Sequence, residues 1–175
     1  MQFVENRPHP DTELDFEELY NLNFSKINRY LRYRITNTWD ADDLTTLVFM
    51  KALDKFHTYR GQSSFSSWLF RIAHNVYVDY VRGYRELTVI DDLLQQQPAM
   101  EGNPEEQLLV NEELDELRAM LNQLTPDYRD VMALRYAGEL RFGQIAEVLG
   151  KTEAAVRMTH HRAIKSLRQQ MQPKG

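Results

Sequence analysis

The sequence contains no cysteine, which excludes disulfide bonds and thiolate-held zinc or iron–sulfur sites. It also lacks any apolar stretch near the roughly 18 residues that a membrane span requires. The first residues, MQFVENRPHPDTE, mix charges with prolines and have no apolar segment of the kind found in signal peptides. We therefore expect a soluble, cytoplasmic protein that does not contact a membrane.

Motifs of catalysis are missing as well. The sequence has no phosphate-binding glycine loop, no set of metal ligands at a recognised spacing and no nucleophile paired with a base. His160 and His161 are adjacent, so on one helix they point about 100° apart and cannot hold the same ion. We expect His160 to be a half-buried packing residue and His161 to contact a DNA groove. We expect no enzymatic activity, no metal and no cofactor.

The chain also lacks the net positive charge common among proteins that bind duplex DNA on their own. Its 175 residues include 21 basic and 26 acidic side chains, a formal net charge of -5. The charge is uneven, because residues 141–175 hold seven basic and two acidic residues (+5) and residues 1–140 carry -10. A basic segment favours DNA contact, whereas the acidic remainder opposes DNA binding by the whole free chain.

Nearly every apolar pattern in the sequence has helical spacing, and no strand-like alternation appears. We therefore predict an all-α protein. Steps of three and four trace two stripes that we expect to be buried. The first consists of Phe16, Tyr20, Phe24, Ile27, Leu31 and Ile35, and the second of Phe65, Trp68, Leu69, Ile72, Val76 and Tyr80. Between them, Asp40 is expected to cap the start of another helix.

The helical pattern predicts two small domains joined by a flexible linker. The first spans residues 14–86 and closes near the helix breaker Gly83. Residues 87–104 contain two prolines, a glycine and a glutamine run without an apolar stripe, which is typical of a linker. The second domain spans residues 105–171, within which Thr125 and Pro126 suit the N-cap and the first position of a helix.

The stretch AEVLGKTEAAVRMTHHRA, residues 146–163, has the spacing of a helix-turn-helix. Ala146 is the small residue at the helix crossing, Gly150 permits the tight turn and Val156 fixes the second helix from below. Thr152 is expected to cap that second helix. Its outward face would reach DNA bases or phosphates. That face consists of Arg157, Met158, His161, Arg162, Lys165 and Arg168.

Residues 60–85, RGQSSFSSWLFRIAHNVYVDYVRGYR, interleave aromatic and cationic side chains. Unpaired bases stack on aromatic rings and every phosphate is negative, so this composition is typical of a surface for single-stranded DNA. The alternative is that the aromatic residues are mostly core, which is expected in part for Phe65, Trp68 and Tyr80 on the buried stripe.

Several separate motifs together resemble the extracytoplasmic-function group, group IV, of bacterial RNA polymerase sigma factors of the sigma-70 family. They are, in chain order, DADDLTTLVFMKALDKF, YRGQSSFSSWLFRIAHNVYVDYVR, NPEEQL, LNQLTPDYRDVMALRY and LRFGQIAEVLGKTEAAVRMTHHRAIKSL. The resemblance implies a sigma domain 2 over residues 14–86 and a sigma domain 4 over residues 105–171. Both would bind core RNA polymerase.

The resemblance also implies a role for particular residues. The helix from Asp43 to Phe56 would dock on the clamp of the largest polymerase subunit. Its candidate contacts are Asp43, Leu47, Phe49, Lys51 and Ala52, with Thr46 and Leu47 in place of the usual Gln-Glu pair. A loop would capture a flipped base of the minus-ten element, and the following helix would hold the melted strand. Their candidates are Arg60, Gln62, Ser63, Ser64 and Phe65 in the loop, and Arg71, Asn75 and Arg82 in the helix.

The second helix of the helix-turn-helix would recognise the minus-thirty-five element through Arg157, Met158, His161, Arg162 and Lys165. Ala154 and Ala155 replace a usual Gly-Thr pair, so we expect an uncommon upstream sequence preference. The leading hypothesis is therefore a promoter-specificity subunit that binds core polymerase and promoter DNA in double- and single-stranded form. The alternative is a self-sufficient helix-turn-helix regulator. An anti-sigma factor is a further partner that the resemblance allows.

Overall fold

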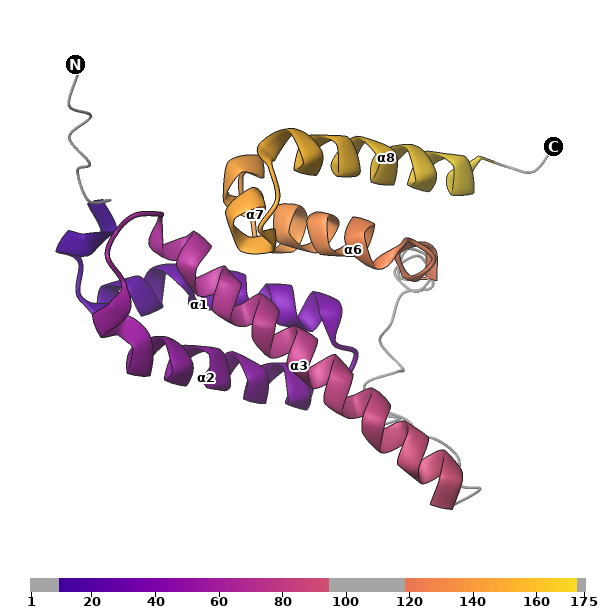
Figure 1. Ribbon diagram of the computed structural model, residues 1–175, viewed down its shortest axis with the longest axis horizontal. Helices are drawn as coiled ribbons and strands as arrows, with labels where there is room; N and C mark the ends of the chain where they lie inside the picture. The colour runs from indigo at the N-terminus through magenta and orange to yellow at the C-terminus, as the bar shows by residue number, and fades with distance from the viewer. Residues whose placement is uncertain (1–9, 95–118, 173–175) are drawn as a thin grey trace.

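The computed structural model describes residues 10–94 and 119–172, and within these ranges it is helical without strands. An N-terminal bundle of three long helices lies beside a C-terminal unit of shorter ones (Figure 1). The bundle consists of α1 (Phe16–Arg34), α2 (Thr38–Lys55) and α3 (Phe65–Leu94), and the C-terminal unit of α6 (Pro126–Met132), α7 (Phe142–Leu149) and α8 (Glu153–Met171). The predicted all-α class is confirmed. None of the described helices has the length and apolar content to cross a bilayer.

Helix α1 begins with a reciprocal cap. The Glu18 backbone N–H donates to the Asp15 carboxylate at 2.9 Å, and the Asp15 N–H donates to Glu18 Oε2 at 3.0 Å. Its buried residues are Leu19, Asn23, Ile27, Tyr30 and Leu31. The expectation that Phe24 is buried is wrong, since it is 39% exposed and stacks on the ring of Phe49 at the bundle's edge. In the first turns of α1, the buried residues Leu19 and Asn23 each lie one position before the predicted Tyr20 and Phe24.

Helix α2 begins earlier than predicted. The side chain of Asn37 accepts hydrogen bonds from the backbone N–H groups of Trp39 and Asp40, so Asn37 is the N-cap. The expectation that Asp40 caps this helix is therefore wrong. Asp40 lies in the first turn, where its carboxylate accepts a 2.7 Å hydrogen bond from the Tyr80 hydroxyl.

Helix α3 continues through Gly83 to Leu94, past the expected domain boundary at residue 86. A Cβ at Gly83 would have no neighbour within 4 Å, so nothing in the packing requires a glycine or a turn there. A glycine inside a helix costs about 1 kcal/mol, which the surrounding turns offset. The rest of the expected linker, residues 95–104, and residues 105–118 lie outside the described ranges.

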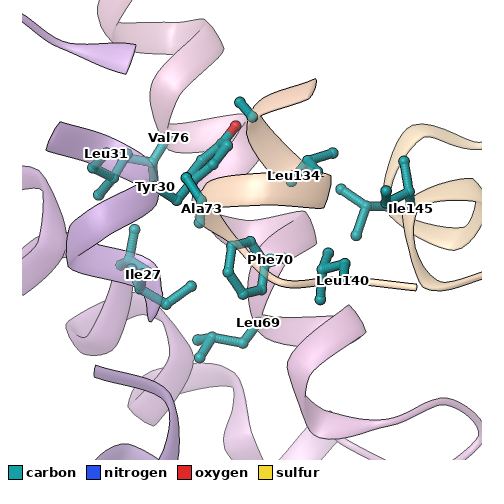
Figure 2. Close-up of a cluster of buried hydrophobic side chains, with 14 of the residues drawn as sticks. Ile27, Tyr30, Leu31, Leu69, Phe70, Ala73, Val76, Leu134, Leu140 and Ile145 are labelled. Carbon is teal, nitrogen blue, oxygen red and sulfur yellow. The ribbon is translucent and has the colours of Figure 1, made fainter. Parts of the chain in front are cut away.

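The N-terminal bundle and the C-terminal unit share one large hydrophobic core, and a smaller separate cluster of Leu124, Met132 and Ala163 lies within the C-terminal unit. Figure 2 shows Tyr30 and Phe70 of the bundle facing Leu134, Leu140 and Ile145 of the C-terminal unit. All five side chains are at most 2% exposed. Neither apolar stripe predicted this face of α3, because Phe70 and Ala73 lie beside the stripe and point to the second unit.

A π-helical turn, η3 (Ala133–Ala137), brings the C-terminal unit against the bundle. At the following Gly138, an added Cβ would lie 2.8 Å from the Leu134 carbonyl oxygen and 2.9 Å from the Phe70 ring, so only glycine permits this approach. Arg29 of α1 fastens the turn, since its Nε donates to the Ala137 carbonyl at 2.8 Å and its Nη2 pairs with Glu139 at 2.9 Å.

A buried polar cluster crosses the same interface. Arg34 Nη2 of α1 lies 2.7 Å from Asp130 Oδ1 of α6, with side chains only 7% and 21% exposed. The Arg34 guanidinium also stacks on the Tyr77 ring at 4.0 Å. Beside it, the Tyr30 hydroxyl and His74 Nδ1 are 3.2 Å apart. Burial raises the pKa of Tyr30 and lowers the pKa of His74, so both are neutral near pH 7.

Candidate nucleic-acid interface

The predicted helix-turn-helix is present in α7 and α8. Gly150 ends α7 in the left-handed conformation, with φ 65° and ψ 37°. Thr152 caps α8, because its hydroxyl accepts the backbone N–H of Ala155 at 3.1 Å. Val156 is fully buried and Ala146 is 7% exposed, as the helix crossing requires. These features confirm the spacing argument.

The outward face of α8 is the one the sequence predicted. Its six exposed residues are Arg157, Met158, His161, Arg162, Lys165 and Arg168. Val156 and Ala163 are the fully buried residues of the opposite face. Four of the six side chains are Arg or Lys and one is an exposed methionine, so the face offers both phosphate contacts and an apolar contact for a thymine methyl group.

The start of α7 adds residues that the sequence analysis missed. The ring of Phe142 is in contact with two guanidinium groups, with the Cζ of Arg135 at 4.6 Å and the Cζ of Arg157 at 4.8 Å from its centroid. Arg135 and the exposed Arg141 line a hollow of about 530 Å³ at the N-terminal end of α7. Cations at the positive end of a helix favour phosphate, and Glu147 and Glu153, which also line the hollow, oppose it. The available signal was Arg141 directly before the first helix of the motif.

His160 is half buried, as expected. Its Nε2 lies 2.8 Å from the Tyr136 hydroxyl, and its ring meets the Phe142 ring edge-on at 5.0 Å. Burial is the main cause that lowers its pKa, with smaller effects from Arg135 and His161. Within the described ranges, no three His, Asp or Glu side chains are grouped as a metal would need.

The loop before α3 is shaped by the protein's own hydrogen bonds. Gly61 has a φ of 68°, the Tyr59 hydroxyl donates to the Ser63 carbonyl at 2.8 Å, and the Ser64 hydroxyl accepts the Ser67 N–H at 3.1 Å. Arg60 and Gln62 are exposed, and Ser63 and Ser64 are half buried. Four of the five predicted loop contacts therefore reach the surface.

Phe65 is the exception. It is 1% exposed and is enclosed by Phe56, Tyr59 and Trp68, whose ring centroids lie 5.3 to 6.1 Å from its own. The expectation that Phe65 is partly a core residue is confirmed, and its side chain does not reach the surface with the other loop candidates, because the residue begins α3 and points into the bundle. The Phe65 backbone N–H donates to Asp11 Oδ2 at 2.8 Å, which fixes the loop from the other side.

The predicted strand-holding residues of α3 differ in their surroundings. Asn75 and Arg82 are exposed, and Nη1 of Arg82 lies 3.8 Å from Oδ1 of Asp79. Arg71 instead contacts the C-terminal unit, donating from Nη2 to the backbone carbonyl of Glu147 at 2.6 Å. Ser64 is also held there, since Gln144 Nε2 donates to its hydroxyl at 3.1 Å. Helix α7 thus covers part of the surface predicted to bind the melted strand.

The surface of α2 separates the predicted polymerase contacts into two groups. Asp43, Leu47 and Lys51 are exposed. Phe49 and Ala52 are 5% and 0% exposed, so the expectation that they touch a partner directly is wrong; they lie on the inner face of α2. The sequence analysis missed three exposed apolar residues of this helix, Trp39, Met50 and Leu53, each at least 59% exposed.

Fold and site together define a helical protein with a helix-turn-helix and a polar loop beside it. Its sequence matches the signatures of Sigma-70 region 2 over residues 19–86 and Sigma-70 region 4 over residues 114–167. The chain belongs to the sigma-70 family, and it is an RNA polymerase sigma factor, a regulatory factor of transcription initiation. The region 2 match rules against the self-sufficient regulator, which needs no such domain.

Relatives of known name agree with this assignment. The chain is 30% identical over 165 residues to the ECF RNA polymerase sigma factor SigX of Bacillus subtilis, covering 91% of this chain and 85% of SigX. It is 32% identical over 160 residues to the sigma factor YlaC of the same organism, covering 89% of this chain and 91% of YlaC. The relatives place it among the extracytoplasmic-function sigma factors.

Solved structures share the fold at lower identity. The sigma factor RpoE of Bartonella quintana, in complex with the anti-sigma factor NepR, superposes with a TM-score of 0.71 at 21% identity and covers 92% of this chain and 99% of its own. The structure of CnrH with the cytosolic domain of CnrY gives a TM-score of 0.68 at 20% identity, covering 91% and 89%.

Proposed function

We propose that α8 recognises the minus-thirty-five element of the promoter. The observation that carries this proposal is the exposed row of Arg157, Met158, His161, Arg162 and Lys165 on the second helix of a helix-turn-helix. Residues near the start of such a helix reach base edges, and those farther along meet phosphates. Arg157 and Met158 therefore contact bases, and Arg162 and Lys165 contact the backbone. Arg135 and Arg141 add phosphate contacts beside the start of α7.

The loop and α3 act on the minus-ten element. Arg60, Gln62, Ser63 and Ser64 form the polar rim where a flipped base is captured, and Arg71, Asn75 and Arg82 hold the melted strand by its phosphates. Phe65 supports the loop from inside the bundle. Capture of a flipped base costs a few kcal/mol of lost stacking, which these polar contacts and the neighbouring aromatic rings offset.

The exposed face of α2 docks on the clamp of core polymerase. Asp43 and Lys51 supply charge, and Leu47 with Trp39, Met50 and Leu53 supplies an apolar surface. Residues of this kind on one helix face are typical of a partner site, because exposed large apolar side chains are costly unless a partner covers them. Phe49 and Ala52 hold this helix in place from below.

Both DNA elements cannot be bound while the two units share their core. Elements centred ten and thirty-five base pairs upstream lie about 85 Å apart along straight duplex at 3.4 Å per base pair. The whole of α3, with 30 residues, measures about 45 Å at 1.5 Å per residue. The units therefore separate on polymerase, which frees Ser64 and Arg71 from α7.

Within the family, we assign the chain to group IV, with a place of action in the cytoplasm beside core polymerase and no catalytic activity of its own. An anti-sigma protein that binds the packed arrangement is a further partner in this proposal. The structures similar in fold, whose titles name anti-sigma complexes, motivate this partner.

Reconstituted transcription tests the proposal. Core polymerase should initiate at promoters selected from a random library only when this chain is added, and permanganate should detect melted thymines at the minus-ten element. Specific binding by the free chain that core polymerase does not alter would contradict the proposal.

A further inference from the structure

Arg157 does not extend freely into solvent. Its Nε and Nη2 both point at one oxygen of Glu153, with Nε 3.2 Å and Nη2 2.7 Å from Oε1. The two residues are one helical turn apart near the start of α8, where Arg157 is exposed. One edge of the guanidinium, the edge that includes Nε, is therefore occupied by the protein itself.

Two further contacts fix this pair. The guanidinium lies over the Phe142 ring at 4.8 Å, which restricts its plane. The second oxygen of Glu153, Oε2, reaches the start of α7, where a Cβ at Gly143 would lie only 3.3 Å from it. The absence of a side chain at Gly143 gives the carboxylate this place. Glu153 is thus held between α7 and Arg157.

We infer that Glu153 is a positioning residue that commits Arg157 to an end-on contact with a guanine; this rests on the proposed function. A guanidinium has two edges that can each donate two parallel hydrogen bonds. With the Nε–Nη2 edge on Glu153, the Nη1–Nη2 edge remains, and it matches O6 and N7 of guanine in the major groove.

The same carboxylate disfavours the other use of an arginine, which is to anchor a phosphate. A negative charge next to the guanidinium repels phosphate oxygens and reduces sequence-independent affinity. Fixing the side chain before binding also lowers the entropy cost of the specific contact. Glu153 therefore raises the ratio of specific to non-specific binding, rather than affinity in general.

The test compares four single variants as holoenzymes: R157A, E153A, E153Q and E147Q. Each binds a set of promoters with every single base-pair change across the upstream element. E147Q is the matched control, because Glu147 also borders the α7 hollow and loses the same charge but is not bonded to Arg157. R157A should lose discrimination at one base pair by between about 5-fold and 100-fold.

E153A should lose discrimination at that same base pair by about 3-fold to 10-fold. E153Q should lie between E153A and the wild type, because its amide oxygen still accepts from the guanidinium but carries no charge. In the double variant R157A/E153A, discrimination at that base pair should be no lower than in R157A alone. All three single changes of a glutamate should raise binding to non-promoter DNA, and E153A and E153Q should raise it more than E147Q, because only Glu153 is bonded to Arg157.

Unchanged base-pair discrimination in E153A would overturn the positioning role alone. So would a loss of discrimination in E153A that is spread over all base pairs and equals the loss in the control E147Q. A wild-type holoenzyme with no upstream preference would overturn both this inference and the proposed function. Thermal melting of each variant separates these outcomes from loss of the fold.

Discussion

Arg71 on α3 and Glu147 on α7 are joined by a hydrogen bond of 2.6 Å from guanidinium to backbone carbonyl, across a sequence separation of 76 residues. Arg71 is a proposed contact for the melted strand, and Glu147 lies on the first helix of the duplex-reading motif. Under the proposed function, the bond therefore joins the two DNA-binding surfaces to each other, and we expect promoter opening to break it.

The first prediction concerns the buried ion pair between Arg34 and Asp130. Asp130→Ala leaves the Arg34 guanidinium buried without its carboxylate, which should lower the free energy of unfolding by up to about 3 kcal/mol. It should also favour separation of the two units. Because the chain has no cysteine, dyes on cysteines introduced at Glu17 and Gln169 would report that distance by energy transfer.

Asp127→Ala is the control, since it removes the same charge from the same helix but breaks only an exposed pair with Lys151 at 3.6 Å. Its effect on stability should stay under about 0.5 kcal/mol. Equal distances between the two dyes in Asp130→Ala and Asp127→Ala would show that the ion pair does not hold the units together.

A second prediction compares two glycines. Gly138→Ala places a methyl group 2.8 Å from a backbone oxygen and 2.9 Å from the Phe70 ring, and should destabilise the protein by about 1 to 3 kcal/mol. Gly83→Ala meets nothing within 4 Å inside α3 and should stabilise it by about 0.5 to 1 kcal/mol. Denaturant unfolding measures both, and a stable Gly138→Ala variant would contradict the close approach of η3 to α3.

The third prediction compares substitutions of Phe65 and Gln62, of which the first should affect protein stability and the second DNA strand opening. Phe65→Ala removes a fully buried ring and should cost about 3 to 5 kcal/mol in unfolding free energy. Gln62→Ala changes an exposed side chain and should leave stability within about 0.5 kcal/mol while reducing permanganate reactivity at the minus-ten element. Normal strand opening by Gln62→Ala would remove this residue from the proposed base pocket.

The fourth prediction concerns pH. Burial, the largest effect, lowers the pKa of His74 below its ordinary value of 6.5, while Asp130 raises it and Arg34 lowers it. The folded state therefore binds fewer protons than the unfolded state. The contribution of His74 to stability is complete above about pH 6.5 and is lost as the pH falls through the lowered pKa. The Tyr30 hydroxyl lies 3.2 Å from Nδ1, and a protonated ring can only donate at that position.

Unfolding measured from pH 7.5 to pH 5 should show a smaller loss of stability in His74→Gln than in the wild type. His160→Gln serves as a comparison, because His160 also has a lowered pKa but lies outside the shared core. If the wild type and His74→Gln have the same slope, proton uptake at His74 does not weaken the packing.

Local signals account for what the sequence predicted well. The helix-turn-helix depends on Gly150 in the turn and Thr152 at the cap, which act over a few residues and are visible in any single sequence. The outward face of α8 follows from helix geometry once Val156 is placed inward. The family motif then located the polar loop before α3.

Features set by distant contacts were not predictable in this way. Phe49 and Ala52 belong to a family motif that mixes buried and exposed positions of one helix, so the motif alone does not tell which face a residue occupies. The burial of the Phe70 ring depends on the close approach of Gly138, which lies 68 positions later in the chain. Its burial against the C-terminal unit is a tertiary effect that local periodicity does not contain.

Under the proposed function, the core shared by the two units sets how strongly the protein competes for polymerase. If only one molecule in about 100 has its units apart, the apparent dissociation constant for core enzyme is about 100-fold higher than that of the open form. Every substitution that loosens the Phe70–Leu134–Ile145 contact then raises the share of polymerase this factor captures, at the expense of rival sigma factors. Interior packing would thereby tune which genes a cell transcribes, without any change at a DNA-contacting residue.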